Sequence, residues 1–137
     1  MGIVVNDLNK TRDFWINTMG FKLHIEAVEE SPYIDELLAI RDPALTTVKL
    51  IDSNGFIIEL LKFENHHVDS SWSGDLKTAG LTHIALTVDN LVEMVEGLKK
   101  QNFQPLSEIK TSPNKKVKVV FVKGPEAIML ELVQSLE

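Results

Sequence analysis

The chain contains no cysteine among its 137 residues, so disulfides, thiolate metal ligands and a cysteine nucleophile are all excluded. It also lacks any apolar run near the ~20 residues that a membrane-spanning helix requires. Met1 leads directly into "GIVVNDL", without the charged and then apolar segments of a secretory leader. We therefore expect a cytoplasmic protein that does not contact a membrane.

Positive charge is also scarce. Fourteen Lys and Arg residues stand against 20 Asp and Glu residues, a net charge of −6. The densest basic stretch, "KTSPNKKVK" (residues 110–118), has the composition of a turn between solvated strand ends. Nucleic-acid-binding domains are usually basic overall, so we do not expect a nucleic-acid partner.

The sequence contains a diverged internal repeat. "VNDL" (5–8) matches "VDNL" (88–91), at a separation of 83 (88 minus 5). "IIELL" (57–61) matches "MLELV" (129–133), at a separation of 72 (129 minus 57). A second copy with a shorter middle explains the unequal separations, because loops tolerate deletions. The sequence predicts an α+β fold of two βαβββ units, 1–63 and 81–137, joined by a polar linker over 64–80.

The hydrophobic periodicity places the elements of each unit. In the first unit, Asp7 or Asn9 is the expected N-cap, the apolar face of the helix includes Trp15, and the Asn54-Gly55 pair is expected to turn a hairpin. A segment outside the repeat, "SPYIDELLAI" (31–40), is expected to be a short helix, either a flap over a cavity or plain packing. Expected strands are 2–6, 21–28, 46–52, 56–63, 81–88, 103–109, 116–122 and 128–134, and expected helices are 7–19 and 90–102.

Three ionisable residues stand at strand positions between apolar neighbours. Glu59 and Glu131 are at equivalent points of the two last strands, and His83 lies near the start of the first strand of the second unit. A half-buried carboxylate or imidazole is normally paired, protonated or bound to a metal. A mixed imidazole and carboxylate set suits a divalent metal. We therefore interpret His83, Glu59 and Glu131 as candidate metal ligands.

The counterpart of His83 in the first unit falls at position 0, one residue before Met1, so either a longer natural chain supplies this ligand or the protein has lost it. The other histidines do not occupy repeat-equivalent positions. We expect His24, His66 and His67 to be surface residues.

With these features in place, the sequence resembles the vicinal oxygen chelate superfamily, which includes glyoxalase I, extradiol dioxygenases and the bleomycin- and fosfomycin-resistance proteins. The resemblance is carried by "GIVVNDLNKTRDFWINTMGF", "GFIIELLKF", "THIALTVDN" and "IMLELVQ" and covers essentially residues 1–137 as one domain. It implies curved mixed sheets that form a cup-like metal or ligand site. It also implies metal ligation by Glu59, His83 and Glu131, with a cofactor chosen from Ni, Zn, Co, Mn or Fe. The chain departs from the family's usual Asp-Pro-Asp-Gly-Asn turn, having "GPEAI" (124–128) instead.

The resemblance further implies a homodimer that acts on a small-molecule substrate. The favoured function is a glyoxalase I type lyase or isomerase, similar to lactoylglutathione lyase, in which Glu59 or Glu131 moves a proton next to a carbonyl while the metal stabilises the resulting enolate. One alternative is a metal-free drug-binding protein with Trp72, Tyr33 and Phe63 lining its cavity. The other is an Fe(II) extradiol-type dioxygenase, which requires a second histidine ligand. Arg12 and Arg41, the only arginines, form no compact cluster that would indicate a glutathione site.

Overall fold

The structure, a computed structural model, describes residues 1–68 and 75–137. Residue Trp72, which we expected near a ligand cavity, lies outside the described residues, as does the middle of the expected linker. The chain divides into two compact units, Met1–Ser71 and Trp72–Glu137, and we describe each by itself. Within the described ranges, no helix has both the length and the apolar character needed to cross a membrane.

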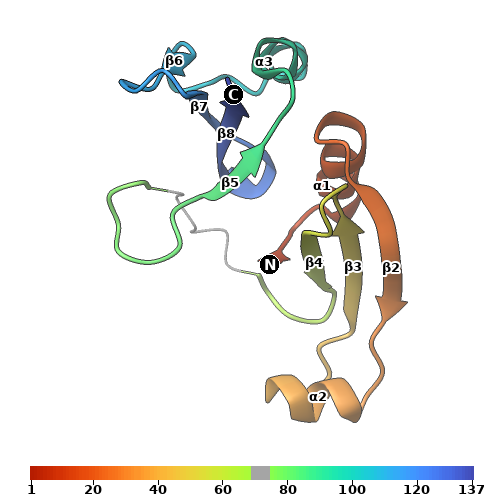
Figure 1. Ribbon diagram of the computed structural model, residues 1–137. Coiled ribbons are helices and arrows are strands. Elements are labelled where there is room, and N and C mark those ends of the chain that lie inside the picture. Colours follow the sequence, from red (N-terminus) through yellow and green to blue (C-terminus); the bar gives the residue numbers. More distant parts are fainter. Residues whose placement is uncertain (69–74) are drawn as a thin grey trace. The chain divides into compact units, whose positions relative to one another are not determined.

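The first unit is a four-stranded mixed sheet with two α-helices (Figure 1). Its strands follow the order β1-β4-β3-β2, in which β1 runs parallel to β4 and the other pairs are antiparallel. The elements are β1 (Gly2–Val4), α1 (Leu8–Asp13), the π-helical turn η1 (Phe14–Thr18), β2 (Lys22–Val28), α2 (Tyr33–Leu38), β3 (Leu45–Ile51) and β4 (Ile57–Phe63).

The second unit repeats this topology, with strands in the order β5-β8-β7-β6 and with β5 parallel to β8. The predicted α+β fold class, with two open, curved mixed sheets, is confirmed. The elements of this unit are β5 (Ile84–Thr87), α3 (Leu91–Lys100), β6 (Lys110–Thr111), β7 (Val117–Lys123), the short 3-10 turn η2 (Pro125–Ala127) and β8 (Met129–Ser135).

The strand registers confirm the sequence repeat residue by residue. Gly2 is paired with Glu59 across β1 and β4, and Ala85 is paired with Glu131 across β5 and β8. The two pairs are related by the same separations that align the sequence phrases, 83 for the first strand and 72 for the last. The two carboxylates therefore occupy equivalent points of the two sheets.

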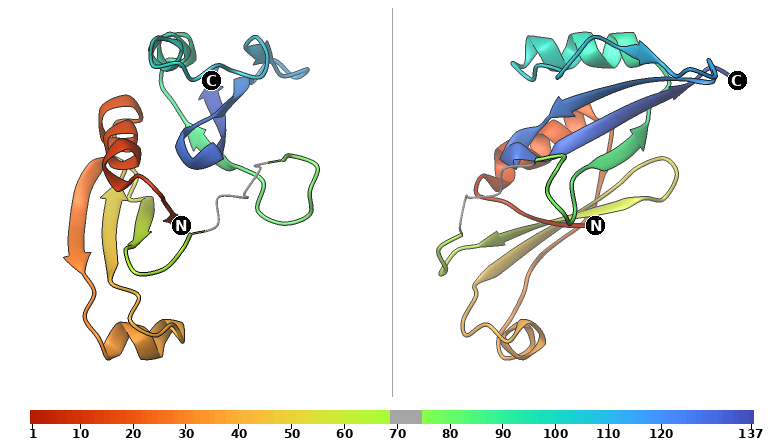
Figure 2. Two further views of the ribbon diagram at one scale, coloured as in Figure 1. Left: turned by 180° about the vertical axis from the view of Figure 1, so that it is seen from behind. Right: turned by 90° about the vertical axis from the view of Figure 1, so that its left-hand side faces the viewer.

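One face of each sheet is covered by a helix, and the strands alternate accordingly. Figure 2 shows α3 lying over one face of β7 and β8, and α1 contacts β4 in the first unit. Burying each large aliphatic side chain in such a layer contributes about 1.5–3 kcal/mol. Fully or nearly fully buried residues of the two layers are Ile3, Val48, Leu50, Ile58 and Leu60 in the first unit, and Ile84, Leu86, Val120, Val122, Leu130 and Leu132 in the second.

Both long helical segments begin where the sequence places a capping residue. The Asp7 side chain accepts a hydrogen bond from the backbone of Lys10 at 2.9 Å, and Asn90 accepts one from Glu93 at 3.1 Å. The expected helix over 7–19 keeps its extent but widens into η1, where the adjacent residues Phe14 and Trp15 are both buried. Trp15 therefore belongs to the core, as expected.

One expected strand does not form as such. Residues 103–109 make a single bridge, between Pro105 and Val122, and the edge strand β6 contains only Lys110 and Thr111. Proline has no backbone N–H to donate, so a regular ladder along this segment is interrupted at Pro105. The prediction of a strand over 103–109 was wrong in extent, although Leu106 still donates to the Phe121 carbonyl at 2.8 Å.

The expected short helix after Ser31 is present as α2, near the ends of β2 and β3 in Figure 1. Ile34 is its buried residue, and Ala39 ends the helix in the left-handed conformation, at φ 55°. Asp35 joins α2 to its surroundings: one carboxylate oxygen accepts from the Ser31 hydroxyl and the other accepts from the Asp42 backbone at 3.0 Å. Asp35 thus links α2 by hydrogen bonds to the residues just before and just after the helix.

The residues that depart from the motif usual in the family that the sequence resembles form the turn between β7 and β8. Glu126 and Ala127 adopt positive φ values of 56° and 58°. The fourth residue of the usual Asp-Pro-Asp-Gly-Asn motif is glycine, and Ala127 stands in that place here. The chain keeps the left-handed backbone of the turn without the residue that favours it.

Replacing Ala127 with glycine is therefore expected to stabilise the protein by about 1 kcal/mol, because glycine adopts positive φ without a Cβ clash. Urea unfolding of the two proteins measures this difference. Ala27→Gly, within β2, is the matched control and is expected to destabilise by about 0.5–1 kcal/mol. An unfolding free energy that falls in Ala127→Gly would contradict the assignment of strain to this turn.

The pKa of Asp35 is held below its usual value, first by the hydrogen bond from Ser31 and then by that from the Asp42 backbone. Because the folded state favours the charged carboxylate, its stabilisation is present above the ordinary pKa of about 3.9 and is lost as pH falls through the lower folded value. We expect Asp35→Asn to lower Tm at pH ~6, and we expect this difference to shrink as the pH falls through the lowered pKa of Asp35. Glu36→Gln, on the same helix, is the control. A Tm difference that persists unchanged into acid would refute this account.

Candidate functional site

The face of the second sheet that α3 does not cover is called its open face. Its main polar feature is the contact between His83 and Glu131. The imidazole Nε2 lies 3.1 Å from the Glu131 carboxylate Oε2. Glu131 is in the middle of β8, opposite Ala85 of β5, and His83 precedes Ala85 by two residues and so shares its face. The parallel pairing of the first and last strands of the unit therefore brings these two residues together.

Two neighbours fix the His83 ring. The Thr82 hydroxyl oxygen lies 2.8 Å from Nδ1, and the Phe121 ring meets the imidazole edge to face at a centroid distance of 5.3 Å. The His83 side chain is 33% exposed and that of Glu131 is 27% exposed, so both are reachable from solvent but partly screened from it. The pair is held in place while remaining open to a ligand.

A hydroxyl group next to Nδ1 permits both neutral forms of the ring. When Nε2–H donates to the Glu131 carboxylate, Nδ1 is an acceptor and the Thr82 hydroxyl donates to it. When Nε2 instead presents its lone pair to a cation, Nδ1–H can donate to the same hydroxyl oxygen. Thr82 thus acts as the orienting partner that a histidine metal ligand normally has.

Glu59 has a different partner. On the open face of the first unit, its Oε1 lies 3.6 Å from the Lys49 ammonium, and the two residues are directly opposed across β3 and β4. Phe121 is opposed to Glu131 in the same way across β7 and β8. Lysine therefore occupies in the first unit the position that phenylalanine occupies in the second.

Sequence reasoning did not identify Lys49. The signal was present, because a hairpin that turns at Ser53-Asn54-Gly55 is centred on Asn54, and Lys49 and Glu59 are equally far from that residue along the chain. The observed register places Lys49 opposite Glu59. Counting back from the predicted turn would have found the pair.

The chemistry of the donors tests whether a metal would fit. His83 and Glu131 supply an imidazole nitrogen and a carboxylate oxygen on one face, a combination that divalent transition metals accept. Within 1–68 and 75–137, no three His, Cys, Asp or Glu side chains are grouped closely enough to hold an ion. The structure therefore brings together two of the three predicted ligands, and Glu59, in the other unit, is bound to Lys49.

The remaining residues singled out from the sequence have other surroundings. His24 is exposed in β2 at the point where the register with β3 shifts, and His66 is exposed and contacts the Arg41 carbonyl at 2.8 Å. His67 is exposed as well. Tyr33 is 64% exposed on α2, whereas Phe63 is partly buried at the end of β4. The histidines are surface residues, as predicted.

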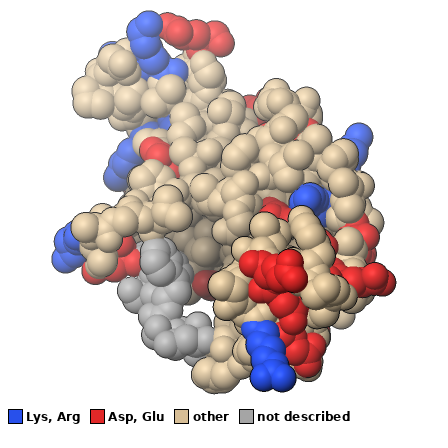
Figure 3. All heavy atoms as spheres, turned by 90° about the horizontal axis from the view of Figure 1, so that it is seen from below, with Lys and Arg blue, Asp and Glu red and all other residues tan. Residues whose placement is uncertain are grey.

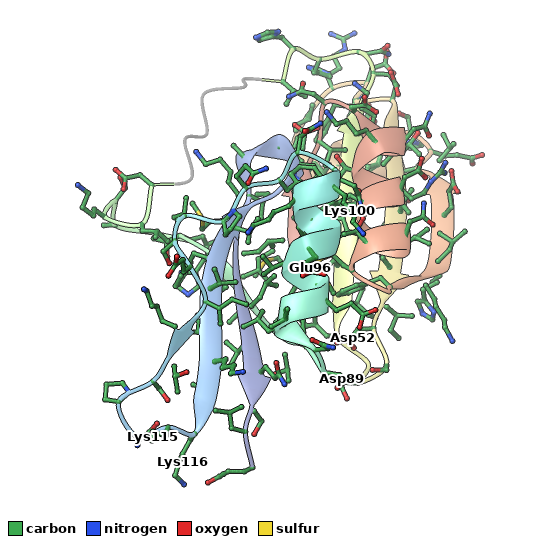
Figure 4. All side chains as sticks on the ribbon, turned by 90° about the horizontal axis from the view of Figure 1, so that it is seen from above. Asp52, Asp89, Glu96, Lys100, Lys115 and Lys116 are labelled. Carbon is green, nitrogen blue, oxygen red and sulfur yellow. The ribbon has the colours of Figure 1, made fainter. Side chains whose placement is uncertain are left out.

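Charged side chains of both signs are interspersed on the face shown in Figure 3. The basic run of the sequence forms the β6–β7 turn, where Figure 4 shows Lys115 and Lys116 at the tip. Lys116 pairs with Glu137 at 2.7 Å, and Lys110 lies 3.9 Å from Glu108. Glu96 and Lys100 lie one helical turn apart on α3, on its exposed side. Two lysines of the run, Lys110 and Lys116, are therefore accompanied by carboxylates.

Two βαβββ sheets that each carry a ligand-type carboxylate in the last strand define a protein of the vicinal oxygen chelate class. The sequence profile of the Glyoxalase/Bleomycin resistance protein/Dioxygenase superfamily matches residues 1–121, and the chain belongs to this superfamily. No curated protein sequence matches the chain.

Several solved structures share the fold of this chain. A glyoxalase family protein from Bacillus cereus superimposes with a TM-score of 0.90 at 21% identity, over 100% of this chain and 92% of the other. The fosfomycin resistance protein FosX from Listeria monocytogenes, solved with Mn(II) and sulfate, matches with a TM-score of 0.62 at 15% identity, over 98% and 88%. A glyoxalase I variant from Zea mays matches with a TM-score of 0.67 at 18% identity, and this chain covers 43% of its length.

The contacts of His83 predict its tautomer. In the neutral imidazole of the metal-free protein, we expect the proton on Nε2, facing Glu131. NMR of the imidazole nitrogens distinguishes the two tautomers. Glu131→Leu is expected to shift the population toward Nδ1–H, because the acceptor for Nε2–H is lost. Glu126→Leu, at the nearby turn, is the control. A majority Nδ1–H form in the unaltered protein would show that the Glu131 contact does not orient the ring.

Proposed function

We propose that the chain is a metal-dependent lyase or isomerase of the glyoxalase I type, which acts on a small substrate carrying carbonyl and hydroxyl oxygens. The observation that carries the proposal is the 3.1 Å contact between His83 and Glu131, oriented by Thr82, on an open sheet face. Membership of the superfamily supports it. The proposal places the enzyme in the cytoplasm as a homodimer.

His83 and Glu131 are the proposed holders of a divalent cation, and Glu59 is a further proposed ligand because it stands at the point of β4 that matches Glu131 in β8. When bound, such a cation polarises substrate oxygens and stabilises negative charge that develops on them. Ni, Zn, Co, Mn and Fe all accept this donor set. The Mn(II) in the FosX structure makes manganese a reasonable first choice.

The residues of the chain have separate proposed roles in the reaction. The Glu131 carboxylate, or that of Glu59, takes a proton from the carbon next to the substrate carbonyl and returns it at another position. Thr82 keeps the His83 ring in one orientation, and the Phe121 ring excludes water from one side of the imidazole. Val133 flanks Glu131 on β8, is partly buried and provides an apolar surface on which a small substrate packs.

A metal-free small-molecule binding protein is the second candidate. It is favoured by the pairing of Glu59 with Lys49, which satisfies that carboxylate without a metal. An extradiol-type dioxygenase is a weaker proposal, since it needs a second histidine beside His83, and among the described residues no histidine contact with that pair is found.

Elemental analysis and metal titration separate these candidates. We expect about one equivalent of a divalent metal per chain, and we expect His83→Ala to weaken its binding on the order of 100-fold or more, because a ligand is lost. His24→Ala, which removes an exposed histidine of β2, is the matched control and should bind normally. Metal far below one equivalent, not restored by Ni, Co, Zn, Mn or Fe, would favour the binding protein instead.

A further inference from the structure

The two units differ at one position of otherwise equivalent site faces. Across the last hairpin of each unit, Glu59 is opposed to Lys49 and Glu131 is opposed to Phe121. A positive charge therefore lies beside one carboxylate, and an uncharged ring stands opposite the other. The difference bears directly on which carboxylate is available to a cation.

The pair between Lys49 and Glu59 lies on a partly buried surface. The lysine side chain is 39% exposed and the glutamate side chain 33% exposed, with an N–O distance of 3.6 Å. Ile51 follows Lys49 by two residues on β3, and Ile57 and Leu61 flank Glu59 on β4, all three partly buried. Apolar neighbours reduce the screening of the two charges by water, so the pair attracts more strongly than a fully solvated one.

A carboxylate held in this way is a poorer ligand for a second cation. A divalent metal that approaches Glu59 must either displace the ammonium group or tolerate its repulsion at close range. Glu131 has a contact of the opposite kind, because its neighbour His83 is itself a metal-ligand type. The two faces thus differ in their readiness to bind a cation.

We propose that Lys49 competes with a metal ion for the Glu59 carboxylate and so weakens metal binding by the protein. This inference rests on the proposed function only in taking Glu59 as a potential ligand. In the unaltered protein, Glu59 takes part in cation binding only to the extent that Lys49 releases it.

Lys49→Met tests the proposal, because methionine retains much of the length and apolar character of the side chain without its charge. Titration of the purified full chain with Mn(II) and Zn(II), followed by calorimetry, is expected to show binding tighter by about tenfold. The double variant Lys49→Met/Glu59→Gln should lose this gain, because the released carboxylate is absent. Folding of each variant is checked by thermal unfolding.

A control for net charge is available on the neighbouring strand. Lys62, on β4, is opposed to Thr46 and so lies on the opposite side of the sheet from Glu59. Lys62→Met removes the same charge and should leave metal affinity within about twofold of the unaltered protein, since a distant surface charge is screened by salt. Equal tightening in both lysine variants would assign the effect to overall charge and overturn the proposal.

The outcomes separate this inference from the proposed function. If the unaltered protein binds metal through His83 and Lys49→Met binds no more tightly, the inference fails and the metal-dependent function stands. If only Lys49→Met binds metal, the inference stands and the proposed function of the natural chain fails. If neither protein binds metal, both are overturned.

Discussion

Parallel pairing between the first and last strands of each unit is the constraint on which the candidate site depends. In the second unit, β5 lies beside β8, and this contact places His83 next to Glu131. In the first unit, β1 lies beside β4 in the matching register. The hairpins and helices complete each sheet, but they do not determine which residue of the first strand lies beside the ligand-type carboxylate. That choice is made by the register of one parallel pair.

The two units show how a repeated scaffold supports different chemistry at equivalent positions. Glu59 and Glu131 occupy the same point of the sheet, with their side chains on the face opposite the covering helix. Their surroundings differ because single residues differ: lysine in β3 against phenylalanine in β7, and His83 at the start of the second unit. The backbone of each unit holds the carboxylate in place, and the neighbours decide what it binds.

Much of this arrangement could be predicted from the sequence because it depends on short-range regularities. Period-two alternation placed Glu59, His83 and Glu131 on strand faces. The Asn54-Gly55 turn and the N-cap expected at Asp7 or Asn9 placed the boundaries of the neighbouring elements to within a few residues. Features that depend on packing were not predicted. The widening of the first helix into η1 depends on the burial of adjacent aromatic residues, and the loss of a regular strand at Pro105 depends on which edge of the sheet that segment joins. Lys49 was not predicted because a lysine has no ligand signature of its own, and only the register of the hairpin places it opposite Glu59.

The parallel pairing also has a consequence for folding kinetics. A hairpin such as β3–β4 closes a short loop, whereas the β1–β4 and β5–β8 pairs join residues far apart in the chain. Two α-helices and two strands lie between β1 and β4, and one α-helix and two strands lie between β5 and β8. Closing such long loops carries a larger entropic cost, and contacts of this kind slow folding. The hairpins can therefore form without the site, whereas His83 meets Glu131 only once the long-range pair has closed. A partly folded second unit of this protein has its carboxylate in place and lacks its histidine partner.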